Sequence, residues 1–240
     1  IILMKRNPNL NYACLPMENA YNVRELGGYA TKKGSVTNHH QFLRSENLTD
    51  ITEEDKTFLI EYGLSAIIDL RSREEALIYP NPFRGNGAVN YMNCPLITED
   101  VLDLREKGFD PGAFYIKLVE YKEMICRIFH FILDNLDGCI LFHCQAGKDR
   151  TGVLAMILMG LAGASKEDII ANYEVTHTYL KENVKLRLDD GLEELEFSRP
   201  EWIENAYDHI LEHYGSFKVY LMAAGLTKKE IKKVRKKLGN

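Results

Sequence analysis

The chain lacks the features that mark a membrane-spanning, nucleic-acid-binding or repeat protein. None of its apolar runs reaches the ~18 residues that a transmembrane helix needs. Lys and Arg number 30 against 35 Asp and Glu, and the net charge of −5 gives no general attraction to nucleic acid. No internal repeat or low-complexity tract occurs, and 45% of the 240 residues are hydrophobic. These properties predict one domain over residues 1–240.

Cysteines are few and scattered, and none forms a Cys-x-x-Cys pair or a zinc-like spacing. They are Cys14, Cys94, Cys126, Cys139 and Cys144. The adjacent His39 and His40 lack further ligands at metal spacing, so we expect no metal and no cofactor. An odd number of thiols favours a reducing compartment such as the cytoplasm. The start at Ile1 rather than at methionine keeps secretion as the alternative.

One segment carries most of the chemistry: residues 143–152, which read HCQAGKDRTG. The apolar run Cys139–Phe142 before it is typical of a buried strand, and residues 151–161 after it are typical of a buried helix. A loop between a strand and a helix N-terminus gathers unpaired N–H groups and partial positive charge. We therefore expect this segment, the thiol loop, to bind a phosphate.

The residue types in the thiol loop suit attack on phosphorus. Cys144 precedes a helix N-terminus and has Cys-x5-Arg spacing to Arg150, so its nucleophilic thiolate form should be favoured. Arg150 offers a planar fork for two phosphoryl oxygens. The amides from Gln145 to Arg150 can curl into a concave nest, and Gly147 permits the positive φ that such a curl needs. We predict Cys144 as nucleophile and Arg150 as the catalytic cation.

The remaining loop residues receive supporting roles. The Thr151 hydroxyl is placed to donate to the sulfur, which would help the sulfur to leave, and the His143 ring is expected to fix the loop through hydrogen bonds. The residues predicted to bind substrate are Gln145, Ala146, Gly147, Lys148 and Thr151.

Three further motifs precede the thiol loop in a fixed order. They are Asn22–Tyr29 (NVRELGGY), Phe42–Ser45 (FLRS) and Ile67–Ser72 (IIDLRS). With the loop, they resemble the bacterial atypical tyrosine and lipid phosphatases, a group of the cysteine-dependent protein tyrosine phosphatase superfamily. The resemblance runs from about residue 20 to residue 238. Residues 1–20 lie outside it and are expected to form a loosely packed N-terminal extension.

The resemblance implies an α/β fold with a mostly parallel central sheet flanked by helices and a helical C-terminal cap. It also implies a bacterial phosphomonoester hydrolase that works through a phosphocysteine intermediate. Strands that alternate with helices as far as residue 161, followed by helices alone, fit the same fold. The alternatives are a catalytically silent phosphate-binding module and another thiol enzyme, such as a sulfurtransferase.

Two carboxylates compete for the role of proton donor. In the resembled group the proposed acid is the loop aspartate, which is Asp149 here. In other phosphatases of the superfamily a mobile loop carries the acid, and here that loop would supply Asp100 or Asp103. We favour Asp149 and keep Asp100 as its alternative. Asp69 is expected to support the structure by pairing with Arg71.

Lys148 and the last helix bear on the substrate. A lysine at this loop position resembles the lipid phosphatases, and a second cation beside Arg150 suits a phosphoinositide head group. The alternative is a lysine at the pocket rim that only raises the local potential. The basic segment 228–238 is expected to be a solvated helix face, with weak contact to a membrane surface as the alternative. Expected partners are therefore a phosphorylated protein or a phosphoinositide.

Further elements follow from local patterns. Strands are predicted at Gln41–Arg44, Ser65–Leu70 and residues 88–93, and one long helix at Ala113–Asn135. Capping signals indicate helix starts at Thr52, Ser165, Ser198 and Thr227. Cys94 is expected to be a small buried residue. A reversible disulfide with Cys144 is the alternative if its loop covers the pocket.

Overall fold

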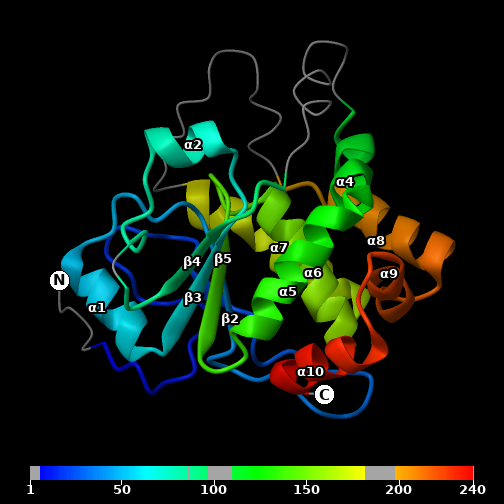
Figure 1. Cartoon of the computed structure of the whole chain (residues 1–240), viewed down its shortest axis with the longest axis horizontal. Coiled ribbons are helices and arrows are strands. Elements are labelled where there is room, and N and C mark those ends of the chain that lie inside the picture. The colour runs from blue at the N-terminus through cyan, green and yellow to red at the C-terminus, as the bar shows by residue number, and fades with distance from the viewer. Residues whose placement is uncertain (1–5, 86, 97–109, 182–197, 240) are drawn as a thin grey trace.

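The computed structural model describes residues 6–85, 87–96, 110–181 and 198–239, and a five-stranded sheet forms its centre (Figure 1). The strands are β1 (Arg24–Glu25), β2 (Phe42–Ser45), β3 (Leu64–Asp69), β4 (Asn90–Asn93) and β5 (Cys139–His143). In the order β1-β2-β5-β3-β4, only β1 runs antiparallel to its neighbour. This sheet, flanked by helices, confirms the predicted α/β fold.

Helices cover both faces of the sheet. They are α1 (Glu53–Glu61), α2 (Arg73–Ile78), α4 (Pro111–Glu120), α5 (Lys122–Asp134), α6 (Asp149–Ala162), α7 (Lys166–Lys181), α8 (Pro200–Tyr214), α9 (Phe217–Ala223) and α10 (Lys228–Leu238). Successive strand side chains alternate between the faces. Ile67 and Leu141 therefore pack on the face with α1, whereas Ile68 and Phe142 pack on the face with α6. The central strands are apolar throughout because both faces are covered.

Two apolar residues of the N-terminal segment pack into the core. Leu15 and Ala20 are each 3% exposed and belong to the core on the α1 face. The Leu15 amide donates to the Val23 carbonyl at 2.8 Å, and the Arg6 guanidinium lies 2.8 Å from Asp55 on α1. Leu15 and Ala20 thus complete the core beside α1, whereas residues 6–14 are partly or fully exposed, and the loosely packed extension over residues 1–20 stays a prediction.

The predicted long helix over residues 113–135 is wrong, because two helices occupy this range. Tyr121, with φ −76° and ψ 57°, ends α4 and precedes α5. The first helix packs mainly on α8, whereas the second packs on α9 and α10. Apolar residues at helical spacing continue across the break, so the sequence pattern does not reveal it.

The capping signals are partly correct. Thr52 and Thr227 form complete capping boxes at the starts of α1 and α10. Ser198 does not cap α8, which begins with Pro200 after Arg199 and has no side-chain cap. Helix α2 is not among the predicted elements, although Ser72 and Glu75 form a capping box at its start that the sequence contains.

Candidate active site

The thiol loop lies at the carboxyl edge of the parallel strands. In the sheet register His143 pairs with both Ser45 and Asp69, so β2, β5 and β3 end together. The loop leaves β5 at this edge and enters α6 at Asp149. Cys144, the first loop residue after β5, is 2% exposed. The nucleophile predicted from the sequence therefore lies at the centre of the sheet edge.

Four successive carbonyl groups of the loop accept hydrogen bonds, one from the His143 ring at the start of the loop and three from donors outside it. The bonds run from His143 Nδ1 to Cys144 O (3.0 Å), from Asn47 N to Gln145 O (2.9 Å), from Asn22 Nδ2 to Ala146 O (3.2 Å) and from Arg44 Nη2 to Gly147 O (2.7 Å). In a planar trans peptide the next N–H points away from the carbonyl. The amides that follow these carbonyls therefore turn away from the four supporting donors, as a phosphate nest requires.

Gly147 is the residue that allows this curl. Its φ is +68°, in the region that favours glycine. A Cβ atom at this position would lie 2.5 Å from backbone atoms of Ser45 and Glu46, a separation that demands movement of β2 or of the loop. The sequence prediction of a positive φ at Gly147 is confirmed.

We expect Gly147→Ala to destabilise the protein by about 3 kcal/mol and to lower activity severely, because it combines backbone strain with a backbone clash. Gly34→Ala is the matched control: Gly34 also has positive φ (+76°), but no heavy atom lies within 4 Å of the place that its Cβ would occupy. It should cost only about 1 kcal/mol. Urea unfolding of both variants measures the difference. Equal losses would contradict the packing argument.

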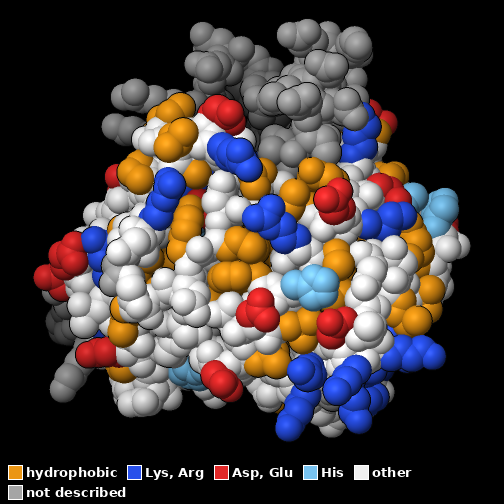
Figure 2. Space-filling model, viewed as in Figure 1, with side chains coloured by type: hydrophobic (Ala, Val, Ile, Leu, Met, Phe, Trp, Pro, Cys, Tyr) orange, Lys and Arg blue, Asp and Glu red, His pale blue; other side chains and the backbone are white. Residues whose placement is uncertain are grey.

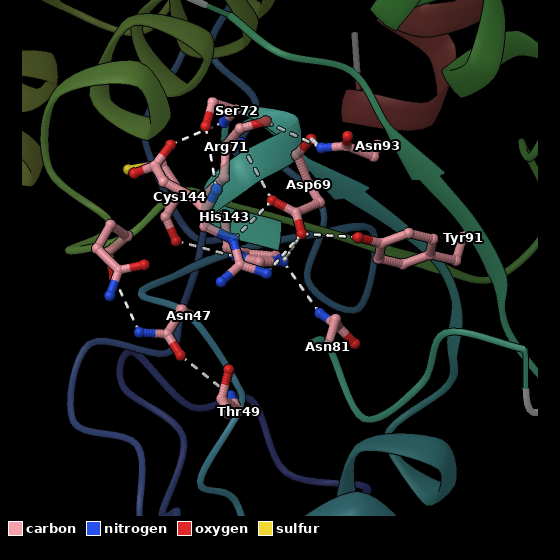
Figure 3. Close-up of polar contacts among 12 residues, drawn as sticks. Asn47, Thr49, Asp69, Arg71, Ser72, Asn81, Tyr91, Asn93, His143 and Cys144 are labelled. Atoms are coloured by element: carbon pink, nitrogen blue, oxygen red, sulfur yellow. Dashed lines mark hydrogen bonds and ion pairs between the residues drawn. The ribbon is translucent and has the colours of Figure 1, made fainter. Parts of the chain in front are cut away.

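The His143 ring supports the loop from below (Figure 3). It is fully buried, and burial lowers the pKa of His143, so the ring is neutral. With Nδ1 donating to the Cys144 carbonyl, Nε2 accepts from Asn81 Nδ2 at 3.0 Å. The predicted ring hydrogen bonds of His143 are therefore present.

Asp69 lies beside the same ring, with its Oδ2 3.6 Å from His143 Nε2, and is held by Arg71 (Figure 3). The Arg71 guanidinium donates to both Asp69 carboxylate oxygens at 2.9 and 2.7 Å, and the Tyr91 hydroxyl donates at 2.7 Å. Although burial opposes ionisation, the Arg71 guanidinium and the Tyr91 hydroxyl keep the pKa of Asp69 below its usual range. The predicted pairing with Arg71 is confirmed, and Asp69 is fully engaged as an acceptor.

Arg150 points to a carboxylate that the sequence analysis missed. Its two terminal nitrogens donate to the two Glu75 oxygens at 2.6 and 2.9 Å. Although burial opposes both charges, this pair lowers the pKa of Glu75 and raises that of Arg150. Glu75 belongs to α2 and fixes the plane of the guanidinium beside the thiol loop. A guanidinium has five N–H donors, and the two bonds to Glu75 are the ones that Arg150 makes to described side chains, which leaves donors for an oxyanion.

Asp149 lies at the start of α6 in a network of donors. The buried Tyr115 hydroxyl of α4 donates to it, and the Lys148 ammonium lies 3.1 Å from the same oxygen. Tyr115 also shares a 2.5 Å hydrogen bond with the Tyr173 hydroxyl. The Asp149 side chain is 32% exposed, so it is both held and accessible.

Lys148 does not lie at an open rim. Its side chain is 6% exposed, and its ammonium lies 4.8 Å from the centre of the Trp202 ring on α8. The ammonium therefore has a cation–π contact and a carboxylate neighbour within the site. Its predicted role in binding a second phosphate stays a prediction.

Two further sequence expectations have different outcomes. Thr151 Oγ1 is buried and has no hydrogen-bond partner among the residues that the structure describes, so the predicted donation to sulfur is not observed there. Its hydroxyl lies in the first turn of α6. Asp100 and Asp103 lie outside the described residues.

The alternative of a disulfide between Cys94 and Cys144 does not fit the sheet. These residues follow β4 and β5, which lie on either side of β3. Two strand spacings separate their Cα atoms by about 10 Å, whereas a disulfide bridges at most about 7 Å. Burial raises the pKa of Cys94 to about 11. Cys94 is a buried packing residue, which agrees with the first of the two expectations.

Within the described ranges, no group of three or more His, Cys, Asp and Glu residues is placed to hold a metal ion. None of the helices in those ranges is long and apolar enough to cross a membrane. His40 stacks on the Tyr62 ring with centroids 4.0 Å apart.

Comparison with known proteins gives consistent matches. The profile of the tyrosine phosphatase family matches residues 15–240. A tyrosine-protein phosphatase from Nostoc commune is 29% identical over 217 residues, covering 82% of this chain and 74% of the relative. The triple specificity protein phosphatase PtpB from Mycobacterium tuberculosis is 28% identical over 267 residues, covering 90% and 95%. The structure of P. aeruginosa TpbA in complex with pTyr aligns with a TM-score of 0.41 and 13% identity, covering 79% and 90%.

Proposed function

Since the chain belongs to the tyrosine phosphatase family, we propose that it removes phosphate from phosphotyrosine proteins through a phosphocysteine intermediate. The observation that carries this proposal is the set of four loop carbonyls held from behind, which turns the amides after Cys144 toward one side. Amides at a helix N-terminus bind the oxygens of a phosphoryl group. The thiol at the base of the same loop supplies the nucleophile.

The proposed reaction has two displacements. The Cys144 thiolate attacks phosphorus, an S–P bond forms, the P–O bond to the substrate breaks, and Asp149 gives a proton to the leaving oxygen. Water then attacks the phosphocysteine, its proton passes to the Asp149 carboxylate, and the S–P bond breaks to release inorganic phosphate. Arg150 and the loop amides stabilise the equatorial oxygens in both steps.

We extend the proposal to phosphoinositides because of Lys148, a cation beside Asp149 and close to Arg150 in sequence. The basic face of α10 does not contribute to this activity. Lys237 of α10 donates to the Gly138 carbonyl just before β5, so α10 lies at the opposite edge of the sheet from Cys144. Figure 2 shows its Lys and Arg side chains gathered along that edge. Membrane contact through this helix would hold the thiol loop away from the bilayer.

A substrate panel tests the function. We expect hydrolysis of a phosphotyrosine peptide and of a soluble short-chain phosphoinositide, with no gain when the lipid is presented in anionic vesicles. Hydrolysis of the peptide without hydrolysis of the phosphoinositide would contradict the proposed activity on lipids. Phosphate binding without turnover of any phosphomonoester would instead support the silent binding module.

Asp149→Asn should lower kcat on a phosphotyrosine peptide by about 10²-fold to 10⁴-fold, because the amide cannot protonate the leaving oxygen. The loss should be smaller on an aryl phosphate whose leaving group needs no proton. Asp100→Asn is the matched control and should keep most of the activity. A loss confined to Asp100→Asn would transfer the acid role to that residue.

A further inference from the structure

Two arginines lie buried behind the thiol loop on neighbouring strands. Arg24 on β1 is 3% exposed and Arg44 on β2 is 0% exposed. They stand directly opposite each other in the antiparallel pair. Like charges at opposed positions destabilise a sheet. Such a placement needs a compensating interaction.

The two guanidinium groups are bound by neutral acceptors. All their hydrogen bonds to described residues go to backbone carbonyls, amide oxygens or a hydroxyl, from Asn22, Gly147, Lys148, Asn172 and Thr176. Their Nε atoms have no hydrogen-bond partner in the same part of the chain. A buried charge is costly unless an opposite charge compensates it.

The nearby buried carboxylate, Glu46, is engaged elsewhere. It accepts from the Tyr21 amide at 2.6 Å, from the Asn22 amide at 3.2 Å and from the Ser45 hydroxyl at 3.1 Å. Burial raises the pKa of Glu46 above its usual range. Among the described residues, the other titratable groups with the largest influence on the pair, Cys144 apart, are Cys14, Tyr29, Tyr173 and Tyr179. Within the described part of the chain, a carboxylate therefore does little to compensate the two positive charges.

The thiol loop lies on the other side of the pair. Arg44 Nη2 donates to the Gly147 carbonyl at 2.7 Å, which places its charge directly behind the loop. Burial lowers the pKa of Arg24 to about 10. Burial and the charge of Arg24 lower the pKa of Arg44, whereas the negative charge of ionised Cys144 raises it. The anion that this pair lacks is therefore present at the active site.

We propose that Arg24 and Arg44 form a buried cation pair whose charge stabilises the two anions of the active site, the ionised Cys144 and the bound phosphoryl group. Opposite charges interact strongly in a site that contains little water. Arg44 also positions the loop through Gly147. Arg24 makes no direct hydrogen bond to the loop in the described part of the chain, but it donates to the side-chain oxygen of Asn22, whose Nδ2 donates to the Ala146 carbonyl. Arg24 therefore has a role by charge and a positioning role through Asn22. The part of this proposal that concerns the bound phosphoryl group rests on the proposed function, whereas the part that concerns ionised Cys144 does not.

The decisive experiment follows alkylation of Cys144 by iodoacetamide as a function of pH, read by mass spectrometry of the Cys144 peptide. Arg24→Met should raise the pH midpoint by about one unit, which lowers the rate about tenfold below both midpoints. Arg24→Lys keeps the charge and should keep the midpoint near that of the wild type. Arg127→Met is the control, since it removes one exposed positive charge from α5.

A purely structural role would lower the melting temperature of Arg24→Met and leave the midpoint unchanged, which would overturn the proposal. If Arg24→Met does not fold, a comparison of melting temperatures between wild type and Cys144→Ser tests the proposal. The melting temperature of wild type relative to Cys144→Ser should rise with pH as the thiol ionises, and a flat difference contradicts the proposal. A shifted midpoint in a protein that hydrolyses no phosphomonoester would reject the phosphatase mechanism and keep the cation pair.

Discussion

Cys144→Ser is expected to lower kcat on phosphotyrosine peptides and aryl phosphates by about 10⁴-fold or more. A serine hydroxyl is not ionised at neutral pH and cannot replace the thiolate as nucleophile. The carbonyls of the loop are held by His143, Asn47, Asn22 and Arg44, through bonds that do not involve the sulfur. Phosphate binding should therefore persist while turnover is lost. Steady-state kinetics and calorimetric titration with inorganic phosphate separate the two effects.

A quench experiment on the wild type can detect the phosphocysteine intermediate. Acid quenching of wild type during turnover should leave a phosphoryl group on the Cys144 peptide, which mass spectrometry identifies. Cys126→Ser is the matched control, because Cys126 is a partly exposed free thiol on α5. It should keep full activity. Turnover that survives in Cys144→Ser would exclude the phosphocysteine mechanism.

The fold could be predicted where the sequence signal is local. The apolar runs of β3 and β5 and the capping boxes of α1 and α10 are read from neighbouring residues. The break between α4 and α5 at Tyr121 could not be predicted, because apolar residues at helical spacing continue on both sides of it. Tertiary packing determines where the helix axis turns. Propensity and periodicity are weak against such packing.

The active site shows the same division. The ten residues 143–152 indicate their own chemistry, because they are contiguous and lie between a strand and a helix. Their supports come from far along the chain: Arg44 lies 103 positions before Gly147, and Glu75 lies 75 positions before Arg150. The motifs that contain Arg24 and Arg44 are recognisable in the sequence, but no pattern shows that both side chains turn inward. The sheet register determines which acceptor each arginine binds, and the sequence alone does not show that register.

Arg150→Met should lower kcat/KM by about 10³-fold, because the guanidinium stabilises charge that develops on the phosphoryl oxygens. Arg150→Lys should recover little of this loss, since an ammonium cannot engage Glu75 and an oxyanion through one rigid plane. The Arg150 side chain is 12% exposed and makes both bonds to Glu75. Kinetics on a phosphotyrosine peptide measure both variants. Near-normal activity of Arg150→Lys would show that charge alone suffices.

Glu75→Gln separates the placement of Arg150 from its charge. The amide can accept one hydrogen bond but cannot neutralise or fix the guanidinium, so kcat/KM should fall less than in Arg150→Met. Because the pKa of Glu75 is lowered in the folded state, the pair stabilises the protein above the ordinary glutamate value of about 4.3. That stability is lost as pH falls through the lower folded value. The melting-temperature gap between wild type and Glu75→Gln should therefore close in acid.

Glu74→Gln is the matched control, because this neighbour in the first turn of α2 is exposed, and the carboxylate that pairs with Arg150 is that of Glu75. It should leave kcat/KM unchanged. Because hydrogen bonds at the start of α2 also lower the pKa of exposed Glu74, its effect on the acid dependence of the melting temperature should be in the same direction but smaller than that of Glu75→Gln. If kcat/KM of Glu75→Gln equals that of Glu74→Gln, the loop and the substrate orient the Arg150 guanidinium without help from α2. If it behaves like Arg150→Met, α2 is part of the active site, and the capping box that starts this helix also determines the geometry of catalysis.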